Sequence, residues 1–232
     1  MLVTQQPVFR KFWHAVMPLS ALASGPQPFT LLGEAIVLFL DAQGEPAALR
    51  DRCCHRTAKL SRGWCVDAQG QACERGHIQC GYHGWTYDRG GKVIRIPQYE
   101  ESRAVPPDYK TQAYHCTARY GYAWVALDEP IADIPDIPEF SNPAWRTIFQ
   151  FYETWATSPM RALENSFDNS HFSFVHRATF GVPDAPQPSK YELIENDTGF
   201  YAETVIAAAN PEKFHRISGV QDAVTTRHMR NA

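Results

Sequence analysis

Short apolar segments that alternate with polar turn residues dominate the first half of the chain. Between Phe29 and Asp51 the apolar segments are rich in β-forming residues, and "DAQGEP" between two of them is typical of a hairpin turn. Two more strand pairs are predicted about Gly90-Gly91 and about Tyr120-Gly121. Residues 10–128 are therefore predicted to form a small all-β unit, built as an antiparallel sandwich.

A proline-rich segment follows this unit. The stretch "DEPIADIPDIPEFSNPAW" holds four prolines, which stop regular structure and are typical of a linker between domains. We place the boundary within it, and predict a first domain over residues 1–135 and a second over residues 136–232.

The pattern of the second domain changes to helix and then back to strand. Ser158 is a candidate N-cap with Pro159 at the first helical position, which predicts a helix from about 159 into the 170s. "KYELIENDTGFYAETVIAA" then alternates about residues 196–199 and predicts a hairpin that opens a second antiparallel sheet. The chain as a whole is predicted to be α+β, with an incomplete second domain consisting of a helix and the start of a sheet.

Composition and charge exclude several classes of protein. The apolar fraction of 44% is that of a globular protein, and the net charge of −3 comes with no run of Lys or Arg that suits phosphates, so we expect no nucleic-acid partner. The first residues lack the pattern of a secretory signal, and the longest apolar runs are far below the roughly 18 residues that a membrane span needs. We expect a soluble, cytoplasmic protein.

One Cys and one His lie close together in each of two segments, "CCHRTAKLSRGWC" and "CGYHGW". Cys53-x-His55 and Cys80-x-x-His83 supply two thiolates and two imidazoles, which could bind one zinc ion tetrahedrally. The mixed pairing also suits a diiron cluster in which one iron takes both thiolates and the other takes both imidazoles. Zinc fingers tend instead to collect their cysteines in one knuckle and their histidines on a helix, which favours the cluster.

These four residues in this order, together with "CGYHGW", resemble the Rieske 2Fe-2S motif. The resemblance implies that Cys53, His55, Cys80 and His83 bind a 2Fe-2S cluster, whose potential is raised because two neutral imidazoles replace thiolates.

Three features depart from the Rieske pattern. Cys54 and Gly81 stand where proline or a polar residue is common, and 24 residues separate His55 from Cys80. The extra length falls in "WCVDAQGQACERG", a polar loop that we expect to extend into solvent at little cost. Cys54, Cys65 and Cys73 then have no role at the cluster, and a reducing compartment does not favour a disulfide between the last two.

A second group of chemically active side chains lies in "LENSFDNSHFSFVH", which contains Glu164, Asp168, His171 and His176. Taken alone, the segment is typical of an ordinary polar helix. Five residues advance an ideal helix by about 500°, so the two histidines would lie roughly 140° apart. They can share one ion only if the helix bends, bulges or ends between them, whereas Asp168 and His171 share a face.

The position of this segment downstream of a Rieske motif changes the interpretation. The pattern E-N-x-x-D-x-x-H-x-x-x-x-H resembles the mononuclear iron site of the Rieske non-heme iron oxygenases, catalytic (alpha) subunits. The resemblance implies that His171 and His176 bind a mononuclear Fe(II) with open positions for dioxygen. It also implies that Asp168 links a cluster histidine of a neighbouring subunit to an iron-ligating histidine.

The third ligand of that iron, a carboxylate in the family, comes from a helix much further along than this chain extends. None of the carboxylates after His176 has the expected placement. Either the chain is a truncated form, or water or a nearby carboxylate such as Asp168 completes the site; we favour truncation. Half a domain should leave apolar surface and sheet edges uncovered.

The resemblance implies an oxygenase that feeds electrons from the 2Fe-2S cluster to the mononuclear iron, for hydroxylation or demethylation of a small organic substrate with O2. The implied partners are a ferredoxin or flavin reductase as electron donor and, for the full-length domain, two further copies in a homotrimer. Two other classes stay open: a Rieske ferredoxin-like electron carrier without its own oxygenase activity, and a zinc-stabilised binding module. The segment "ENSFDNSHFSFVH" weighs against a simple carrier, which has no need of it.

Overall fold

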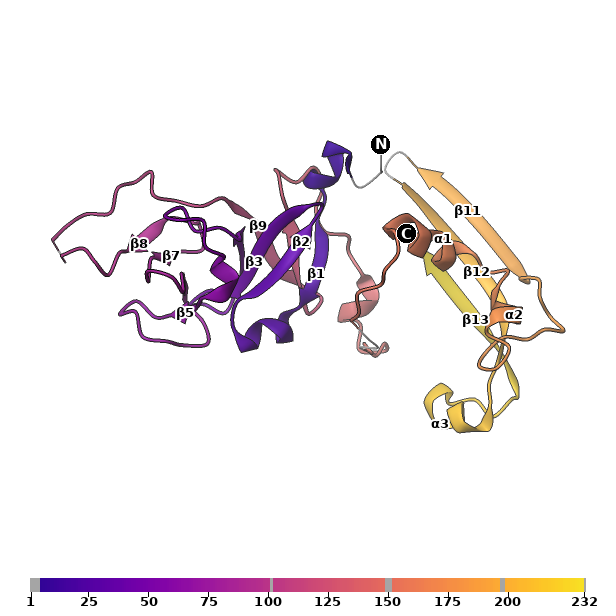
Figure 1. Ribbon diagram of the computed structural model, residues 1–232. Coiled ribbons are helices and arrows are strands. Elements are labelled where there is room, and N and C mark those ends of the chain that lie inside the picture. Colours follow the sequence, from indigo (N-terminus) through magenta and orange to yellow (C-terminus); the bar gives the residue numbers. More distant parts are fainter. Residues whose placement is uncertain (1–4, 101, 149–151, 197–198, 232) are drawn as a thin grey trace. The chain divides into compact units, whose positions relative to one another are not determined.

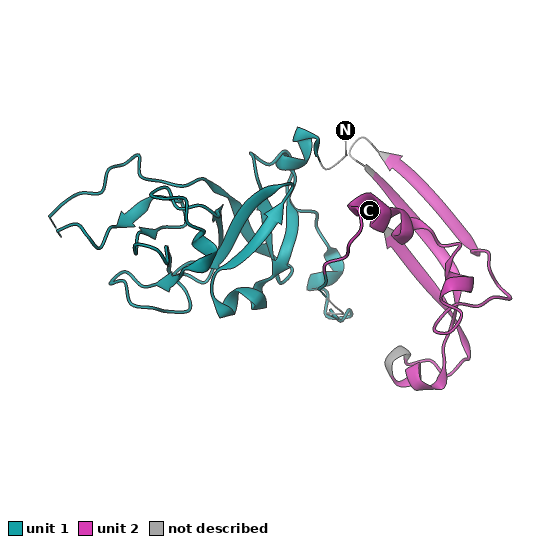
Figure 2. Cartoon of the chain, in the orientation of Figure 1, with its two compact units in different colours: residues 1–153 teal, residues 154–232 magenta. Residues whose placement is uncertain are grey.

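The chain forms two compact units, Met1–Glu153 and Thr154–Ala232 (Figure 2). The structure is a computed structural model, and it describes residues 5–100, 102–148, 152–196 and 199–231. Strands and long loops make up unit 1, and a sheet with short helices makes up unit 2 (Figure 1). This is the α+β composition that the sequence predicts.

Unit 1 is built on two antiparallel sheets. The larger sheet has six strands in the order β1-β10-β9-β4-β3-β2, and the smaller has four in the order β5-β6-β7-β8. The strands of the larger sheet are β1 (His14–Pro18), β2 (Gln27–Leu31), β3 (Glu34–Leu40), β4 (Pro46–Arg50), β9 (Ala113–Arg119) and β10 (Tyr122–Ala126). Those of the smaller sheet are β5 (Trp64–Val66), β6 (His77–Gln79), β7 (Thr86–Tyr87) and β8 (Val93–Arg95). Short 3-10 helices lie at Pro7–Lys11, Leu19–Ser24, Leu60–Arg62 and Pro138–Ser141.

Strand β3 is buried on both faces and so joins two cores. Val37 and Phe39 lie in the core shared with the four-stranded sheet. Ile36 and Leu38 point the other way, into the core formed with β1 and β10. The alternation of side chains along a strand explains this division. It confirms the predicted sandwich.

The β9–β10 hairpin turns where the sequence predicts it. Tyr120 (φ 54°) and Gly121 (φ 79°) both adopt the left-handed conformation that a two-residue type I′ turn requires. Leu32 (φ 49°) and Gly33 (φ 84°) do the same between β2 and β3. These turns fix the register of the six-stranded sheet.

The proline-rich segment packs on unit 1 because side chains of the β9–β10 hairpin bind it. Arg119 donates to the Ile134 carbonyl (2.6 Å) and pairs with Asp136 (2.9 Å). The Tyr120 hydroxyl donates to the Pro135 carbonyl (3.0 Å). The two compact units therefore divide at 153/154, whereas the prolines alone suggest a boundary at 135/136.

Unit 2 contains a three-stranded antiparallel sheet in the order β11-β12-β13. Its strands are β11 (Lys190–Asn196), β12 (Gly199–Ala209) and β13 (Val224–Asn231). The predicted β11–β12 hairpin is present, and its turn residues 197–198 lie outside the described residues. The helices are α1 (Pro159–Phe167), α2 (Phe172–Val175) and α3 (His215–Ser218), with a 3-10 turn at Glu212–Phe214.

The helix expected from 159 into the 170s is two helices rather than one. The predicted cap is correct, since the Ser158 hydroxyl accepts the Arg161 N–H (3.3 Å) and Pro159 opens α1. However, α1 ends at Phe167, and its C-cap Asp168 is extended. The Asp168 carboxylate accepts the N–H of Ser170 (2.8 Å), and such local side-chain bonds compete with helical pairing.

Several large apolar side chains of unit 2 face solvent. On β11, Tyr191 is 60% and Leu193 49% exposed, and on α2 Val175 is 70% exposed. Contiguous exposed apolar groups of this kind mark surfaces that other structure covers. Across the described ranges, no helix combines the length and apolarity needed to cross a bilayer.

We predict that Gly63→Ala destabilises unit 1. Gly63 has an ordinary backbone conformation (φ −95°), but an added Cβ would lie 1.8 Å from the Gln79 backbone carbonyl oxygen. Because backbone must move to relieve this clash, urea unfolding followed by circular dichroism should show a loss of about 1–3 kcal/mol. Gly90→Ala is the control, since its nearest neighbour is the Asp88 side chain at 3.3 Å. Equal stability of the two variants would contradict the described packing of these loops.

Candidate metal centres

The first centre lies in two loops of unit 1 that share one backbone hydrogen-bond pattern. In the β4–β5 loop, Cys53 N–H donates to the Ala58 carbonyl (2.8 Å), and Thr57 N–H donates to the Cys53 carbonyl (3.0 Å). In the β6–β7 loop, Cys80 N–H donates to the Trp85 carbonyl (2.9 Å), and Gly84 N–H donates to the Cys80 carbonyl (3.0 Å). Each loop is thus a closed turn that begins at a cysteine.

The residue four positions after each cysteine adopts a left-handed conformation. Gly84 (φ 75°) does so without a steric penalty, whereas Thr57 (φ 58°) is β-branched and is strained there. Such strain persists only where the surrounding structure holds it. It is consistent with a functional constraint on the first loop.

The two loops bring the Cys53 and Cys80 thiols together. Both side chains are buried, at 2% and 1% exposure. Hydrogen bonding between the two thiols lowers the pKa of Cys53 and raises that of Cys80. Backbone N–H groups of His55 and Arg56 also lower the pKa of Cys53. Two adjacent buried thiolates would repel each other, and a metal cation would remove that cost.

The two imidazoles form the outer edge of the same centre. The rings of His55 and His83 have centroids 4.6 Å apart, and His55 is exposed while His83 is half-buried. The four predicted residues therefore come together as a sulfur pair and a nitrogen pair. Across the described part of the chain, no three His, Cys, Asp or Glu side chains group around one ion. In a diiron cluster each iron has only two protein ligands, so this donor set fits it.

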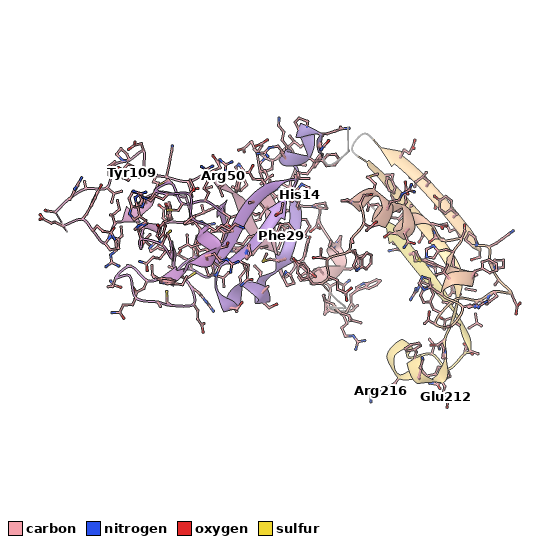
Figure 3. All side chains as sticks on the ribbon, viewed as in Figure 1. His14, Phe29, Arg50, Tyr109, Glu212 and Arg216 are labelled. Atoms are coloured by element: carbon pink, nitrogen blue, oxygen red, sulfur yellow. The ribbon has the colours of Figure 1, made fainter. Side chains whose placement is uncertain are left out.

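An aromatic stack supports His55. The Trp85 ring lies parallel to His55 (4.5 Å between centroids, 3° between planes), and Tyr109 stacks on Trp85 (5.2 Å, 16°). Figure 3 places Tyr109 at the end of unit 1 that carries the four-stranded sheet, away from His14 and Phe29 on the six-stranded sheet. The stack holds one face of the imidazole and leaves its edge accessible.

Sequence reasoning missed two residues that organise this centre. The Tyr87 hydroxyl lies 3.0 Å from Cys53 Sγ and accepts the Cys54 N–H (3.1 Å), and its side chain is fully buried. The buried Asp51 carboxylate accepts both the N–H and the hydroxyl of Ser61 (2.7 Å each), which closes the first loop. A signal for Tyr87 was present, because it lies two residues after Trp85, and in the strand that the sequence predicts there such residues share a face. In the structure Trp85 directly precedes β7.

Of the other cysteines, Cys54 adjoins the sulfur pair, because it follows Cys53 and contacts the same Tyr87 hydroxyl. All six are free thiols, and Cys65 is buried in β5 while Cys73 is exposed. The spacer between the loops is a hairpin, bridged at Val66 and Ala72, with its tip at residues 67–71. Cys54 is exposed, and its sulfur lies 3.3 Å from the Tyr87 hydroxyl.

The second centre is formed by two histidines at opposite ends of α2. His171 is the N-cap residue and His176 the C-cap residue, and their ring centroids are 5.3 Å apart. The chain leaves helical geometry at His176 (φ −97°, ψ 17°), so α2 ends between the two histidines. The His176 ring also stacks on Phe180 (4.6 Å, 18°). One of the conditions for a shared ion, a helix end between the residues, is met.

Asp168 orients the first of these histidines. Its Oδ2 lies 3.3 Å from His171 Nδ1, and the His171 side chain is 14% exposed. The Ser170 N–H, and then His171, lower the pKa of the Asp168 carboxyl. With Nδ1 engaged, His171 has Nε2 free for a metal, which is the usual arrangement of a metal-bound imidazole.

No carboxylate completes this second site within the described residues. Glu164 pairs with Arg161, and Glu203 pairs with Lys190 and Arg230. The two histidines fit two positions of a facial iron site, and the third position has no protein ligand in this part of the chain.

Two family models match the chain, one for each unit. A Rieske [2Fe-2S] domain matches residues 12–114, and a vanillate O-demethylase oxygenase C-terminal domain matches residues 155–231. The first match contains all four residues of the first centre, and the second contains both histidines of the second centre.

Curated proteins of similar sequence are oxygenases and demethylases. Methylxanthine N3-demethylase NdmB of Pseudomonas putida is 35% identical over 190 residues, which are 78% of this chain and 52% of that protein. Pheophorbide a oxygenase of Oryza sativa is 32% identical over 206 residues, 80% of this chain and 36% of that protein. The chain thus spans about half the length of the first of these and about a third of the second.

Solved structures of the same kind share the fold. The structure of Pseudomonas putida CBB5 NdmA with caffeine matches with a TM-score of 0.73 and 30% identity over 90% of this chain and 59% of that one. Dicamba monooxygenase bound to dicamba matches with a TM-score of 0.75 and 27% identity over 96% of this chain and 63% of that one. A Rieske domain binds a 2Fe-2S cluster, and proteins of this kind also use a mononuclear iron.

We predict that Tyr87→Phe lowers the reduction potential of the cluster. A hydroxyl that donates to a cluster thiolate withdraws charge from the sulfur and stabilises the reduced form. Spectroelectrochemical titration of the visible bands should therefore give a lower midpoint than in the unchanged protein. Tyr109→Phe is the control, because the Tyr109 hydroxyl interacts with Tyr99 instead. A Tyr87→Phe midpoint equal to that of the control would show that the hydroxyl does not reach the sulfur.

Proposed function

This chain belongs to the Rieske non-heme iron oxygenase catalytic (alpha) subunits, and we propose that its protein hydroxylates or demethylates a small organic substrate with O2. The observation that carries the proposal is the presence of both centres in one chain, in the order of the family. When bound, the 2Fe-2S cluster would supply single electrons, and the mononuclear iron would supply a site for O2.

Cys53, Cys80, His55 and His83 are the proposed ligands of the cluster. The sulfur pair is buried, which suits the iron that lies further from solvent. The imidazole pair is the more accessible edge of the site, through which electrons can enter and leave. Tyr87 and the aromatic ring of Trp85 hold one ligand from each pair in place.

His171 and His176 are the proposed protein ligands of the mononuclear iron. Asp168 fixes the His171 ring through Nδ1, and its side chain is half exposed. A cluster histidine of a neighbouring subunit can therefore donate a further hydrogen bond to this carboxylate. This supports a homotrimer in which one subunit's cluster serves the next subunit's iron. A ferredoxin or flavin reductase is the proposed source of electrons.

Demethylation is the reaction that the relatives favour, because NdmB and NdmA are N-demethylases and the second family model is that of an O-demethylase. The balanced reaction takes one O2, two electrons and two protons. It converts a methyl group to formaldehyde, and it releases the demethylated product and water. Formaldehyde release separates demethylation from simple hydroxylation of the same substrate.

Spectroscopy of anaerobically purified protein tests the first step of this proposal. We expect visible absorption bands and, after reduction, an electron paramagnetic resonance signal of a 2Fe-2S cluster with mixed sulfur and nitrogen ligands. A colourless protein would favour a zinc-stabilised module instead. A coloured protein that supports no substrate-dependent O2 uptake in its full-length form would favour a Rieske electron carrier.

We predict that His171→Ala lowers the iron content of the protein and leaves the cluster spectrum unchanged. The variant removes one imidazole of the second centre, while all proposed cluster ligands lie in unit 1. Iron per chain, measured by mass spectrometry beside the visible spectrum, gives both quantities. His228→Ala on β13 is the control, because that side chain is exposed and belongs to neither centre. Equal iron content in both variants would exclude His171 as a ligand.

A further inference from the structure

The loops around the cluster site carry an uneven distribution of charge. Residues 52–66 contain four Lys or Arg and no Asp or Glu, and residues 75–87 also contain no Asp or Glu. Arg56, Lys59 and Arg62 lie in the first of these segments, and all three are exposed. We call these three residues the basic rim.

The basic rim is not neutralised within the described part of the chain, where no ion pair involves its three side chains. Residues 128–139, which we call the acidic segment of unit 1, hold five Asp or Glu and behave differently. Asp128 pairs with Arg10, and Asp136 pairs with Arg119. The positive charge of the rim is therefore available to a partner, whereas part of the negative charge of the acidic segment is already paired.

The rim lies beside the accessible edge of the cluster site. Arg56 directly follows His55 in the first cluster loop, and its side chain is exposed. At the other end, an added Cβ on Gly81 would meet the Arg62 carbonyl oxygen at 2.8 Å, so the backbone of Arg62 abuts the second cluster loop. The rim therefore extends from one cluster loop to the other.

An exposed aromatic side chain completes this surface. Tyr82 is 64% exposed, and its ring lies 3.9 Å from that of His83. Accessible imidazole edges, an exposed ring and three unpaired cations thus occupy one end of unit 1. Such a combination suits a transient protein contact more than a permanent apolar one.

We propose that Arg56, Lys59 and Arg62 form the docking surface for an acidic electron-donor protein, such as a ferredoxin-type carrier. The inference rests on the proposed function, because it assigns a place to the donor which that function requires. One electron leaves the reduced donor and one enters the cluster, with no bond made or broken. Opposite charges accelerate the encounter and orient the two centres, and the effect weakens as salt screens it.

Stopped-flow reduction of the cluster tests the surface directly. The probe is a reduced acidic plant-type 2Fe-2S ferredoxin, and the variants are Arg56→Gln, Lys59→Gln and Arg62→Gln, separately and combined. At low ionic strength we expect the combined variant to be reduced about tenfold more slowly than the unchanged protein. The rate of the unchanged protein should fall steeply with added salt, and that of the combined variant should change little.

Lys11→Gln is the matched control, because it removes one positive charge from unit 1 at a site beside the acidic segment. The Lys11 carbonyl accepts the N–H of Ile131, which places it away from the rim. Ferredoxin should reduce the cluster of the Lys11→Gln variant at the same rate as that of the unchanged protein.

Small reductants provide a second measurement that does not depend on protein docking. The basic rim should favour the anionic radical of dithionite over the cationic radical of methyl viologen. The rate of reduction by dithionite, divided by the rate of reduction by methyl viologen, should therefore fall in the combined variant. If the combined variant loses its visible bands, the single variants and the salt dependence of the unchanged protein decide the question.

The outcomes separate this inference from the proposed function. A protein without visible bands contradicts the proposed function itself. A coloured protein whose reduction by ferredoxin is insensitive to salt and to all rim variants overturns the docking surface and leaves the oxygenase proposal standing. Rim variants that change the oligomeric mass in light scattering, with unchanged reduction rates, would also overturn it, and would assign the rim to a contact between copies of the chain.

Discussion

The meeting of two buried thiols is the contact on which the first centre depends. Cys53 lies in the β4–β5 loop, which connects the two sheets, and Cys80 lies in the β6–β7 hairpin. Neither sulfur has a favourable place in the core as an isolated anion. Their loops repeat one backbone pattern, so the same local geometry presents each sulfur to the other. The imidazoles, the aromatic stack and the basic rim are all positioned by these two turns.

The two units use different means to place their ligands. In unit 1 the ligands sit on tight turns between strands of a well-buried sandwich, with Tyr87 and Asp51 as supports from the surrounding structure. In unit 2 the histidines cap a single turn of helix, and Asp168 both ends the preceding helix and orients His171. This difference is consistent with a rigid site for electron storage in unit 1 and a more open site for substrate and oxygen in unit 2.

Much of this architecture could be predicted from the sequence. Alternation and turn residues located the hairpins, and Ser158-Pro159 located the start of α1, because these signals are local. The end of α1 was missed because the Asp168 carboxylate accepts the Ser170 N–H. This bond competes with helical backbone pairing, and the spacing of apolar residues gives no sign of it. Tyr87 and Asp51 were missed as supports for the first centre because their partners, Cys53 and Ser61, are distant in sequence and meet only through the fold. The packing of the proline-rich segment depends likewise on Arg119 and Tyr120, which lie on an earlier hairpin.

Each loop of the first centre contributes one sulfur and one nitrogen, so neither loop contains the complete ligand set of either iron. The sulfur-bound metal would bridge the two turns, and so would the nitrogen-bound one. Loading would then require both loops to be folded and next to each other. The colour of the protein would therefore report the correct folding of unit 1 as well as its electron-carrying capacity.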